Sequence, residues 1–186
     1  MGVTTYKQKF NKKFGYPLNR SNSLEQISAD TGYKLKGLKT IYKKGVGAYY
    51  SNPESVRQNV KSAEQWGVAR VYSAVMGGKA KKIDQKHLVK IDKSKLYDIK
   101  RYTYNQAKKL NVKVYPSQTK GKKIDVFKNG QKVAVIGALG YLDYPTFILK
   151  KGKKIADIRR KSYKKRHEKN RKVKGSNGYY ADNLLW

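Results

Sequence analysis

The chain has 186 residues and a formal net charge of +32, because 44 lysines and arginines face only 12 aspartates and glutamates. Its 38% hydrophobic content suffices for one large or two small cores and excludes a disordered tail, while the absence of cysteine excludes disulfides, zinc fingers and thiol chemistry. No run approaches the roughly eighteen apolar residues of a membrane span, so we expect no integral membrane segment. Mutual repulsion at this charge opposes compaction unless anions bind, so the first expectation is a polyanionic partner.

The first segment, residues 1–22, is basic. Over residues 6–22, the anchors expected are Phe10, Phe14 and Pro17. These are too few to hold the segment against a core, so we expect an extended arm that becomes ordered on a partner.

Residues 23–95 are predicted to form a helical domain. Residues 23–26 (SLEQ) are a capping box, in which a serine and a glutamine three positions later bond to free N–H groups at a helix start. The helix that follows is expected to end at the Thr-Gly pair of residues 31–32. A second helix is expected over about residues 33–44, with Gly45 ending it.

Further start signals divide the rest of this domain. Asn52-Pro53 predicts a short helix, because proline fits the first turn. A second capping box at residues 62–65 (SAEQ) begins the clearest helix, residues 62–78, which a glycine pair ends. Residues 79–95 are mostly charged, and we expect a connector with a short helical turn after Asp84.

The hydrophobic period changes in the second half. Residues 96–110 are predicted to be a connecting helix or linker. After them, VKVYPS, KKIDVFKNGQKVAVIGA and TFIL favour strands, and Asn129-Gly130 is typical of a two-residue hairpin turn. The predicted fold is therefore α+β: a helical domain, then a small β-hairpin module over residues 111–186 with a basic C-terminal helix.

That basic helix is predicted over about residues 154–169. Residues 150–174 contain fourteen basic and two acidic side chains, a net charge of 14 − 2 = +12. The residues expected to be buried are Ile155, Ala156, Ile158 and Tyr163. The internal ion pairs expected are Asp157 with Lys161 and Lys164 with Glu168. Each pair contributes only about 0.3–0.5 kcal/mol, which does not offset the repulsion.

We therefore expect an anion against this helix, either phosphate groups or an acidic protein surface. The alternative is an ordinary solvated face. The candidate anion-binding residues are Arg159, Arg160, Lys161, Lys164, Lys165, Arg166, Lys169, Arg171 and Lys172.

The aromatic tail GYYADNLLW is expected to dock onto the hairpin module. The alternative is docking onto a neighbouring subunit. For that alternative, the candidate protein-interface residues are Tyr179, Tyr180, Leu184, Leu185 and Trp186.

Residues 24–45 resemble a helix-turn-helix. That motif needs a small residue, a glycine at the turn and two apolar residues in the second helix, and these roles fall to Ser28, Gly32, Leu38 and Ile41. No Arg, Asn or Gln lies on the outward face for base reading, which favours backbone contact or a helix pair that only packs. The candidate anion-binding residues on that face are Lys34, Lys36, Lys39 and Lys43.

Aromatic side chains surround the helix of residues 62–78. Bases stack on exposed rings in proteins that bind single strands. The alternative is that Trp66 and Tyr72 belong to the core and Arg70 bonds to a helix end. The rings in question are Tyr49, Tyr50, Trp66 and Tyr72.

The sequence gives little support for an enzymatic function. The carboxylates are scattered without metal-ligand spacing, and His87 and His167 are the only histidines. We therefore predict no catalytic residues, no metal and no cofactor.

Two stretches resemble viral families. KKGVGAYYSNPESVR with KSAEQWGVARVYSAVMGGKAKK resembles an uncharacterised domain of bacteriophages and large eukaryotic DNA viruses. The tail, from VKVYPS through KNGQKVAVIGALGYLDYPTF to GYYADNLLW, is similar to an uncharacterised module of nucleocytoplasmic large DNA viruses such as chlorella viruses. The resemblance implies a virus-encoded, virion-associated protein.

The expected function is that of a non-enzymatic structural protein of a large DNA virus, a minor capsid or internal component beneath the capsid shell. It would be made in the host cytoplasm or nucleus. Its partners would be capsid proteins with acidic surfaces, double-stranded DNA, or headgroups of an internal viral membrane. The alternative is a soluble DNA-binding protein that uses the helix-turn-helix-like pair for genome condensation or transcription.

Overall fold

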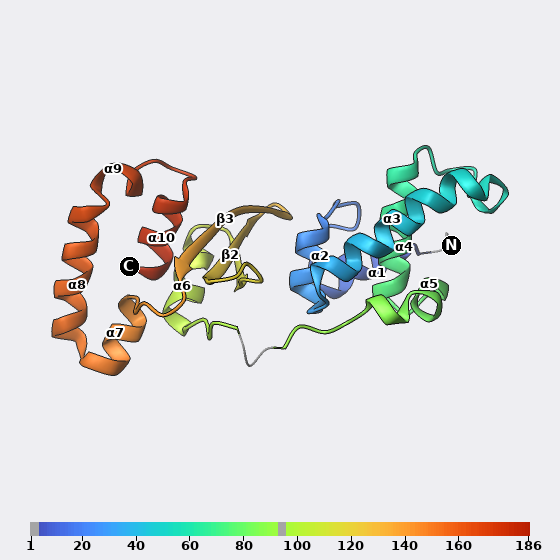
Figure 1. Ribbon diagram of the computed structural model, residues 1–186. Coiled ribbons are helices and arrows are strands. Elements are labelled where there is room, and N and C mark those ends of the chain that lie inside the picture. The colour runs from blue at the N-terminus through green and yellow to red at the C-terminus, as the bar shows by residue number, and fades with distance from the viewer. Residues whose placement is uncertain (1–3, 93–95) are drawn as a thin grey trace. The chain divides into compact units, whose positions relative to one another are not determined.

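The computed structural model describes residues 4–92 and 96–186, which fold as two compact units, residues 1–91 (unit 1) and 92–186 (unit 2). Helices occur in both units, and unit 2 also contains a three-stranded antiparallel sheet, so the fold is α+β (Figure 1). The predicted end of the helical domain, at residue 95, lies outside the described residues.

Unit 1 is helical and has one core. Its elements are α1 (Tyr6–Lys13), α2 (Leu24–Thr31), α3 (Leu35–Ser51), η1 (Pro53–Ser55), α4 (Ala63–Val75), α5 (Lys79–Ile83) and η2 (Gln85–His87). Short 3-10 turns, η1 and η2, form after Asn52 and after Asp84, where the sequence predicts short helices. The core joins α1, α2, α3 and α4.

The extended arm predicted over residues 1–22 is wrong where the structure describes it. Helix α1 begins at a capping box in which the Thr5 hydroxyl accepts a hydrogen bond from the Gln8 backbone N–H. Phe10 is fully buried, with its ring 5.3 Å from that of Tyr72. Asn11 Nδ2 donates to two carbonyls of the following loop, each at 2.8 Å, so this segment belongs to the core of unit 1.

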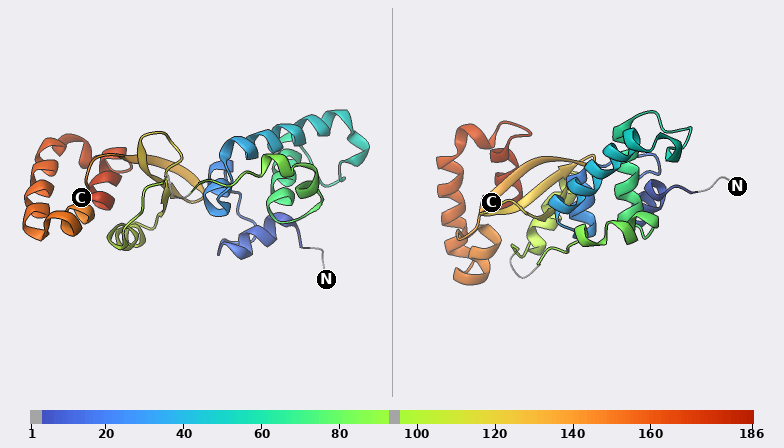
Figure 2. Two further views of the ribbon diagram at one scale, coloured as in Figure 1. Left: turned by 60° about the horizontal axis from the view of Figure 1, so that its bottom comes forward. Right: turned by 45° about the vertical axis from the view of Figure 1, so that its right-hand side comes forward.

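Helix α2 begins and ends as predicted, but α3 is longer. The Ser23 hydroxyl caps α2, and Gly32 follows it with φ = +70°. Helix α3 continues through Gly45, which was expected to end it. Helix α3 packs against α4 (Figures 1 and 2). A Cβ on Gly45 would lie 2.7 Å from the Cα of Gly67 in α4, so this glycine permits close helix packing rather than ending a helix.

Helix α4 begins at the predicted serine cap, since the Ser62 hydroxyl accepts from the Gln65 N–H. The reciprocal bond of the capping box is not formed, because the Gln65 side chain accepts from the Lys61 N–H instead of that of Ser62. After α4, helix α5 occupies the first part of the predicted connector. Of the two alternatives for Arg70, a bond to a helix end is the one observed, since its Nε donates at 2.8 Å to the buried carboxylate of Asp84, the C-cap residue of α5. This ion pair ties α4 to the segment between α5 and η2.

Unit 2 combines a small sheet with helices. Its elements are α6 (Arg101–Lys109), β1 (Lys113–Pro116), β2 (Lys122–Lys128), β3 (Gln131–Ala138), α7 (Tyr144–Lys151), α8 (Lys153–Arg166), α9 (Glu168–Arg171) and α10 (Asn177–Leu185). The strand order is β1-β2-β3. Asn129 and Gly130 both have positive φ in the β2–β3 turn, which confirms the predicted hairpin.

Two predictions for unit 2 need correction. Residues 96–110 are not a separate connector, because Ile99 and Ala107 are buried in the core of unit 2 and the Thr103 hydroxyl donates to the Leu184 carbonyl at 2.9 Å. The TFIL strand is helical, within α7. The Asp143 side chain accepts from the Thr146 N–H and caps this helix, which a proline in its first turn also favours.

The predicted basic helix is two helices. Helix α8 ends at Arg166, and the short α9 follows His167. Helix α10 then packs against β3 and α6, which confirms docking of the tail onto the hairpin module. The ring of Trp186 stacks on that of Tyr163 in α8, with centroids 4.4 Å apart and planes 7° apart.

This docking contradicts the candidate protein interface on the tail. Tyr180, Leu184 and Leu185 are buried in the core of unit 2, and Tyr179 and Trp186 are half-buried against it. These side chains are therefore occupied within their own unit. Within the described ranges, no helix has the length and apolar content needed to cross a bilayer.

Candidate anion-binding surfaces

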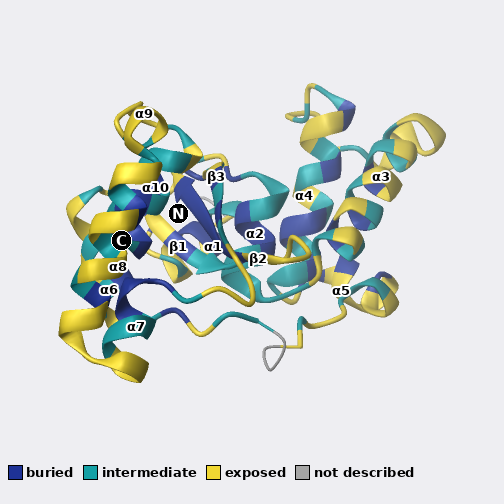
Figure 3. Ribbon diagram, turned by 60° about the vertical axis from the view of Figure 1, so that its left-hand side comes forward, coloured by how far each residue is buried: buried dark blue, intermediate teal, exposed yellow. Residues whose placement is uncertain are grey.

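The basic residues of α8 and α9 fall into two groups. Five are exposed and, within residues 96–186, have no carboxylate within ion-pair distance. We call this group the terminal basic surface: Arg159, Lys161, Lys165, Arg166 and Lys169. Figure 3 shows the exposed colour along α8 and α9.

The other four candidates have partners within unit 2. Lys164 lies 3.7 Å from Asp182 in α10, and the Arg171 guanidinium contacts Asp182 at 3.5 Å and Glu168 at 2.5 Å. Lys172 also pairs with Glu168. Lys164 and Arg171 therefore hold α8 and α9 against α10, whereas the pair of Lys172 with Glu168 is local to α9.

Arg160 is half-buried, with its guanidinium over the ring of Tyr144 at 4.6 Å.

The predicted pair of Asp157 with Lys161 is wrong, because Asp157 pairs with Lys153 at 2.5 Å. The hydrogen bonds from Lys153 and then from the Tyr144 hydroxyl lower the pKa of Asp157. The predicted pair of Lys164 with Glu168 is likewise replaced, since Lys164 faces Asp182.

An apolar strip runs along the exposed side of α8. Ile155 and Ile158 are 43% and 58% exposed, contrary to the expectation that both are buried. At 3.6 residues per turn they fall, with Ser162, between two rows of cations. The rows are Lys154, Lys161 and Lys165 on one side and Arg159 and Arg166 on the other. Ala156 and Tyr163 form the buried face.

A second basic face lies on α3. Lys36, Lys39 and Lys43 are exposed on one side of this helix, and Lys34 is exposed at its N-cap. Lys39 has one acidic neighbour, with its Nζ 3.6 Å from Glu25. We call Lys36, Lys39 and Lys43 the α3 lysine row.

The helix pair beneath this row is arranged as the spacing predicts. Leu38 and Ile41 are fully buried, and the Ser28 hydroxyl donates to the Tyr33 carbonyl at 2.5 Å. With Gly32 at the turn, α2 and α3 therefore pack through the predicted positions. The lysines that follow on the exposed side suit phosphate contacts rather than base reading.

The aromatic residues near α4 divide between core and surface. Tyr72 is buried, and its hydroxyl accepts a hydrogen bond from Asn22 Nδ2 at 3.2 Å. Burial raises the pKa of this hydroxyl. Trp66 and Tyr49 are half-buried, whereas Tyr50 is 72% exposed. Of the four rings, Tyr50 is the one open to a ligand.

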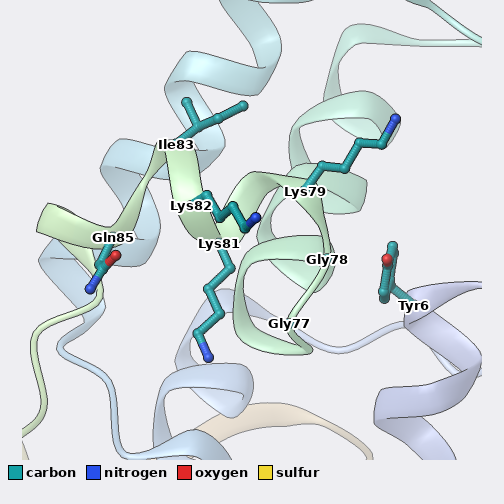
Figure 4. A pocket seen from close by; sticks show the side chains of 8 residues that line it. All are labelled: Tyr6, Gly77, Gly78, Lys79, Lys81, Lys82, Ile83 and Gln85. Carbon is teal, nitrogen blue, oxygen red and sulfur yellow. The ribbon is translucent and has the colours of Figure 1, made fainter.

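A cavity of about 820 Å³ lies beside α5. Figure 4 shows the side chains of Lys79, Lys81 and Lys82 pointing in different directions, so their ammonium groups do not converge on one anion. The lining residues are Tyr6, Gly77, Gly78, Lys79, Lys81, Lys82, Ile83 and Gln85. This cavity is basic but has no cradle for a phosphate.

The interior of unit 2 contains a charged cluster that the sequence did not reveal. Lys123 Nζ donates to Asp143 Oδ2 at 2.5 Å, and the Tyr97 hydroxyl donates to the same oxygen at 2.6 Å. Burial would raise the pKa of Asp143, but hydrogen bonds from Lys123, Thr146 and Tyr97 outweigh it and hold the pKa below its usual value. Burial and the bond to Asp143 raise the pKa of Tyr97. The cluster joins β2 to α7.

The two histidines lie in different units, His87 in η2 and His167 at the C-cap of α8. The ring of His167 lies against that of Tyr163, with centroids 4.4 Å apart. Across residues 4–92 and 96–186, no three His, Asp or Glu side chains gather in a way that could hold a metal ion.

Comparison with family models shows a match to the first half of the chain. A model described as a family of unknown function (DUF5824) matches residues 1–95, which covers unit 1. No curated protein and no solved structure matches the chain.

Proposed function

The chain belongs to the family of unknown function DUF5824, and we propose that it is a non-enzymatic structural protein of a large DNA virus, lying beneath the capsid shell. Its basic surfaces bridge acidic capsid proteins and packaged DNA. The observation that carries this proposal is the terminal basic surface, whose five cations have no carboxylate partner among the described residues of unit 2. The viral setting rests on the resemblance of both halves of the sequence to viral modules.

Helix α8 is difficult to explain without a partner. Only Ala156 and Tyr163 are buried along it, while most of its other side chains are cationic. The carboxylates nearby are already paired with Lys153, Lys164 and Arg171. A polyanion laid along this surface would relieve the remaining repulsion and release its own counterions.

The apolar strip favours a protein partner at this surface in addition to DNA. The side chains of Ile155 and Ile158 cannot form a hydrogen bond or an ion pair with a phosphate group. They suit a partner segment that carries both acidic and apolar side chains. This combination supports a capsid protein with an acidic surface as the partner of α8. DNA would then bind to the α3 lysine row and to the ends of the two rows of cations on α8.

The proposal predicts that the protein is recovered in stoichiometric amounts from purified, nuclease-treated virus particles. Presence only in infected cells would contradict it.

For the DNA contact, retention on a duplex should fall steeply between about 50 and 200 mM salt, without sequence preference. A salt slope near zero would exclude that contact.

A charge-neutral variant tests the terminal basic surface. Changing its five cations to glutamine should lower the salt slope by up to about 4–5, since each phosphate contact contributes about 0.9. A matched control carries the same loss of charge elsewhere on unit 2, with Lys108, Lys109, Lys120, Lys122 and Lys128 changed to glutamine; all five are exposed. Equal losses in the two variants would show that net charge, and not this surface, binds DNA.

A second candidate function is DNA binding through α2 and α3 for genome condensation or transcription. The observation that favours it is the burial of Ser28, Leu38 and Ile41 beneath an exposed lysine row. This candidate predicts that glutamine in place of Lys36, Lys39 and Lys43 removes duplex binding, while the terminal variant retains it.

A further inference from the structure

Helix α3 contains three glycines, and the structure explains two of them. A Cβ on Gly37 would lie 1.9 Å from the His87 carbonyl oxygen, and one on Gly45 would lie 2.7 Å from the Cα of Gly67. A Cβ on Gly47 would meet no described atom within 4 Å, and its φ is not positive. Glycine destabilises a helix interior relative to alanine. Nothing in the described chain requires it at this position.

Gly47 lies in the same exposed stripe as the α3 lysine row. Lys36, Lys43 and Tyr50 follow one another at intervals of seven residues, which is close to two helical turns, and Lys39 and Gly47 fall beside them. All five residues are exposed. The stripe therefore runs from three ammonium groups, past a position with no side chain, to an exposed aromatic ring.

The ring at the end of this stripe is held from one side. Tyr49 is half-buried, and its ring lies edge-on to that of Tyr50, with centroids 5.4 Å apart and planes 83° apart. Tyr50 remains 72% exposed. An exposed tyrosine supported in this way can stack on an unpaired base.

We infer that this stripe of α3 binds single-stranded nucleic acid. The α3 lysine row contacts phosphates, the Tyr50 ring stacks on a base, and the strand crosses the helix at Gly47, where a side chain would hold it away. The inference rests on the proposed nucleic-acid binding and extends it to a second form of the polymer. An unpaired strand fits better than a duplex, because bases in a duplex are already stacked on one another.

The exposed ring and the lack of exposed isoleucine and leucine distinguish this stripe from the surface of α8, for which a protein partner is proposed. Within α3 the stripe contains no isoleucine or leucine that is exposed, so it offers little to an apolar peptide. The charge of the stripe complements a phosphate backbone, and the one glycine lies between the last lysine and the ring.

The experiment measures binding of a labelled oligothymidine and thermal unfolding of the full chain. Gly47→Ala should raise the midpoint of unfolding by about 4 °C, because alanine favours the helix. It should also weaken oligothymidine binding several-fold. Tyr50→Ala should weaken oligothymidine binding about tenfold without changing the midpoint of unfolding. Tyr50→Phe keeps the ring and should bind oligothymidine as the wild-type chain does.

Two control variants match these changes. Ser51→Ala alters an exposed residue of α3 outside the stripe, and Tyr104→Ala removes an exposed ring from α6 of unit 2. Neither should change oligothymidine affinity. Because Gly47→Ala is expected to stabilise the protein, weaker binding by this variant cannot result from misfolding.

The outcomes separate this inference from the proposed function. Unchanged oligothymidine affinity in Gly47→Ala or Tyr50→Ala overturns the inference, while salt-dependent duplex retention by the same protein leaves the proposed function standing. Equal weakening of duplex and single-strand binding by Tyr50→Ala would also overturn it. A wild-type chain that binds neither polymer contradicts both.

Discussion

In unit 1, the buried carboxylate of Asp84 pairs with Arg70 and Lys44, whose side chains are 22% and 40% exposed. In unit 2, Asp143 pairs with Lys123, and the two side chains are only 2% and 5% exposed. Water can therefore reach the cations of the first cluster but is excluded from the second. An ion pair of the same chemistry therefore has different consequences for stability when its cation can still be hydrated.

The largest expected effect is the loss of the buried partner in unit 2. Asp143→Asn should destabilise unit 2 by about 3–5 kcal/mol, because it leaves the Lys123 ammonium buried without a counter-charge. Asp84→Asn should cost unit 1 less, about 1–3 kcal/mol, because Arg70 can turn toward water. Urea unfolding measures both values.

The two tryptophans make this comparison measurable in one chain, since Trp66 lies in unit 1 and Trp186 in unit 2. Each reports on its own unit when the other is changed to phenylalanine. Equal losses in the two variants, or a greater loss for Asp84→Asn, would contradict the role given to hydration of the cation.

A smaller effect is expected from helix packing in unit 1. Gly45→Ala should destabilise this unit by about 1–3 kcal/mol, because the new methyl group would press on the backbone of Gly67. Gly47→Ala, two residues further along the same helix, should stabilise it. Stabilisation of both variants in thermal unfolding would contradict close packing of α3 against α4 at Gly45.

The smallest expected effect is the response of unit 2 to acid. The pKa of Asp143 lies below its usual value of 3.8 in the folded chain. Its contribution to the free energy of unfolding is therefore complete above that value, and it is lost as the pH falls through the folded pKa. Fluorescence of Trp186 during urea unfolding, measured in steps down from pH 5, should show this loss. The same acid profile in the Asp143→Asn variant would refute it.

The sequence predicted those parts of the fold that local signals determine. Ser23 and Ser62 cap α2 and α4, and Asn129-Gly130 closes the β2–β3 hairpin. A similar signal was present at α1, where Thr5 and Gln8 have the spacing of a capping box, so this helix could have been predicted. The Asp143 cap and the proline after it were likewise available for α7.

Other features depend on contacts between distant residues. Gly45 has the same local pattern as a helix stop, and only its position opposite Gly67 shows that it permits close packing. Lys123 and Asp143 are 20 residues apart, and neither position stands out in the sequence. Charged residues on strands and turns are usually solvated, so burial of this pair was not predictable.

The sequence predicted which residues make up the candidate anion-binding surfaces, but not which of them pair within the fold. Exposure of the α3 lysine row followed from helical spacing. The terminal basic residues could not be divided into paired and unpaired groups, because Asp182 comes from α10 and pairs across the tertiary structure with Lys164 and Arg171. The exposed isoleucines of α8 were expected in a core, since hydrophobicity alone does not reveal which face of a helix is covered.

The separate cores of the two units also bear on how the chain is made. All of the buried core of unit 1 comes from residues before 92, so it can close while the ribosome is still adding unit 2. Unit 2 must wait for α10, because Leu184 and Leu185 complete its core. Until that helix emerges, Ile124 and Ile136 of the hairpin stay uncovered on the nascent chain. We expect chaperones to bind at this stage of translation, and to leave once α10 has been added.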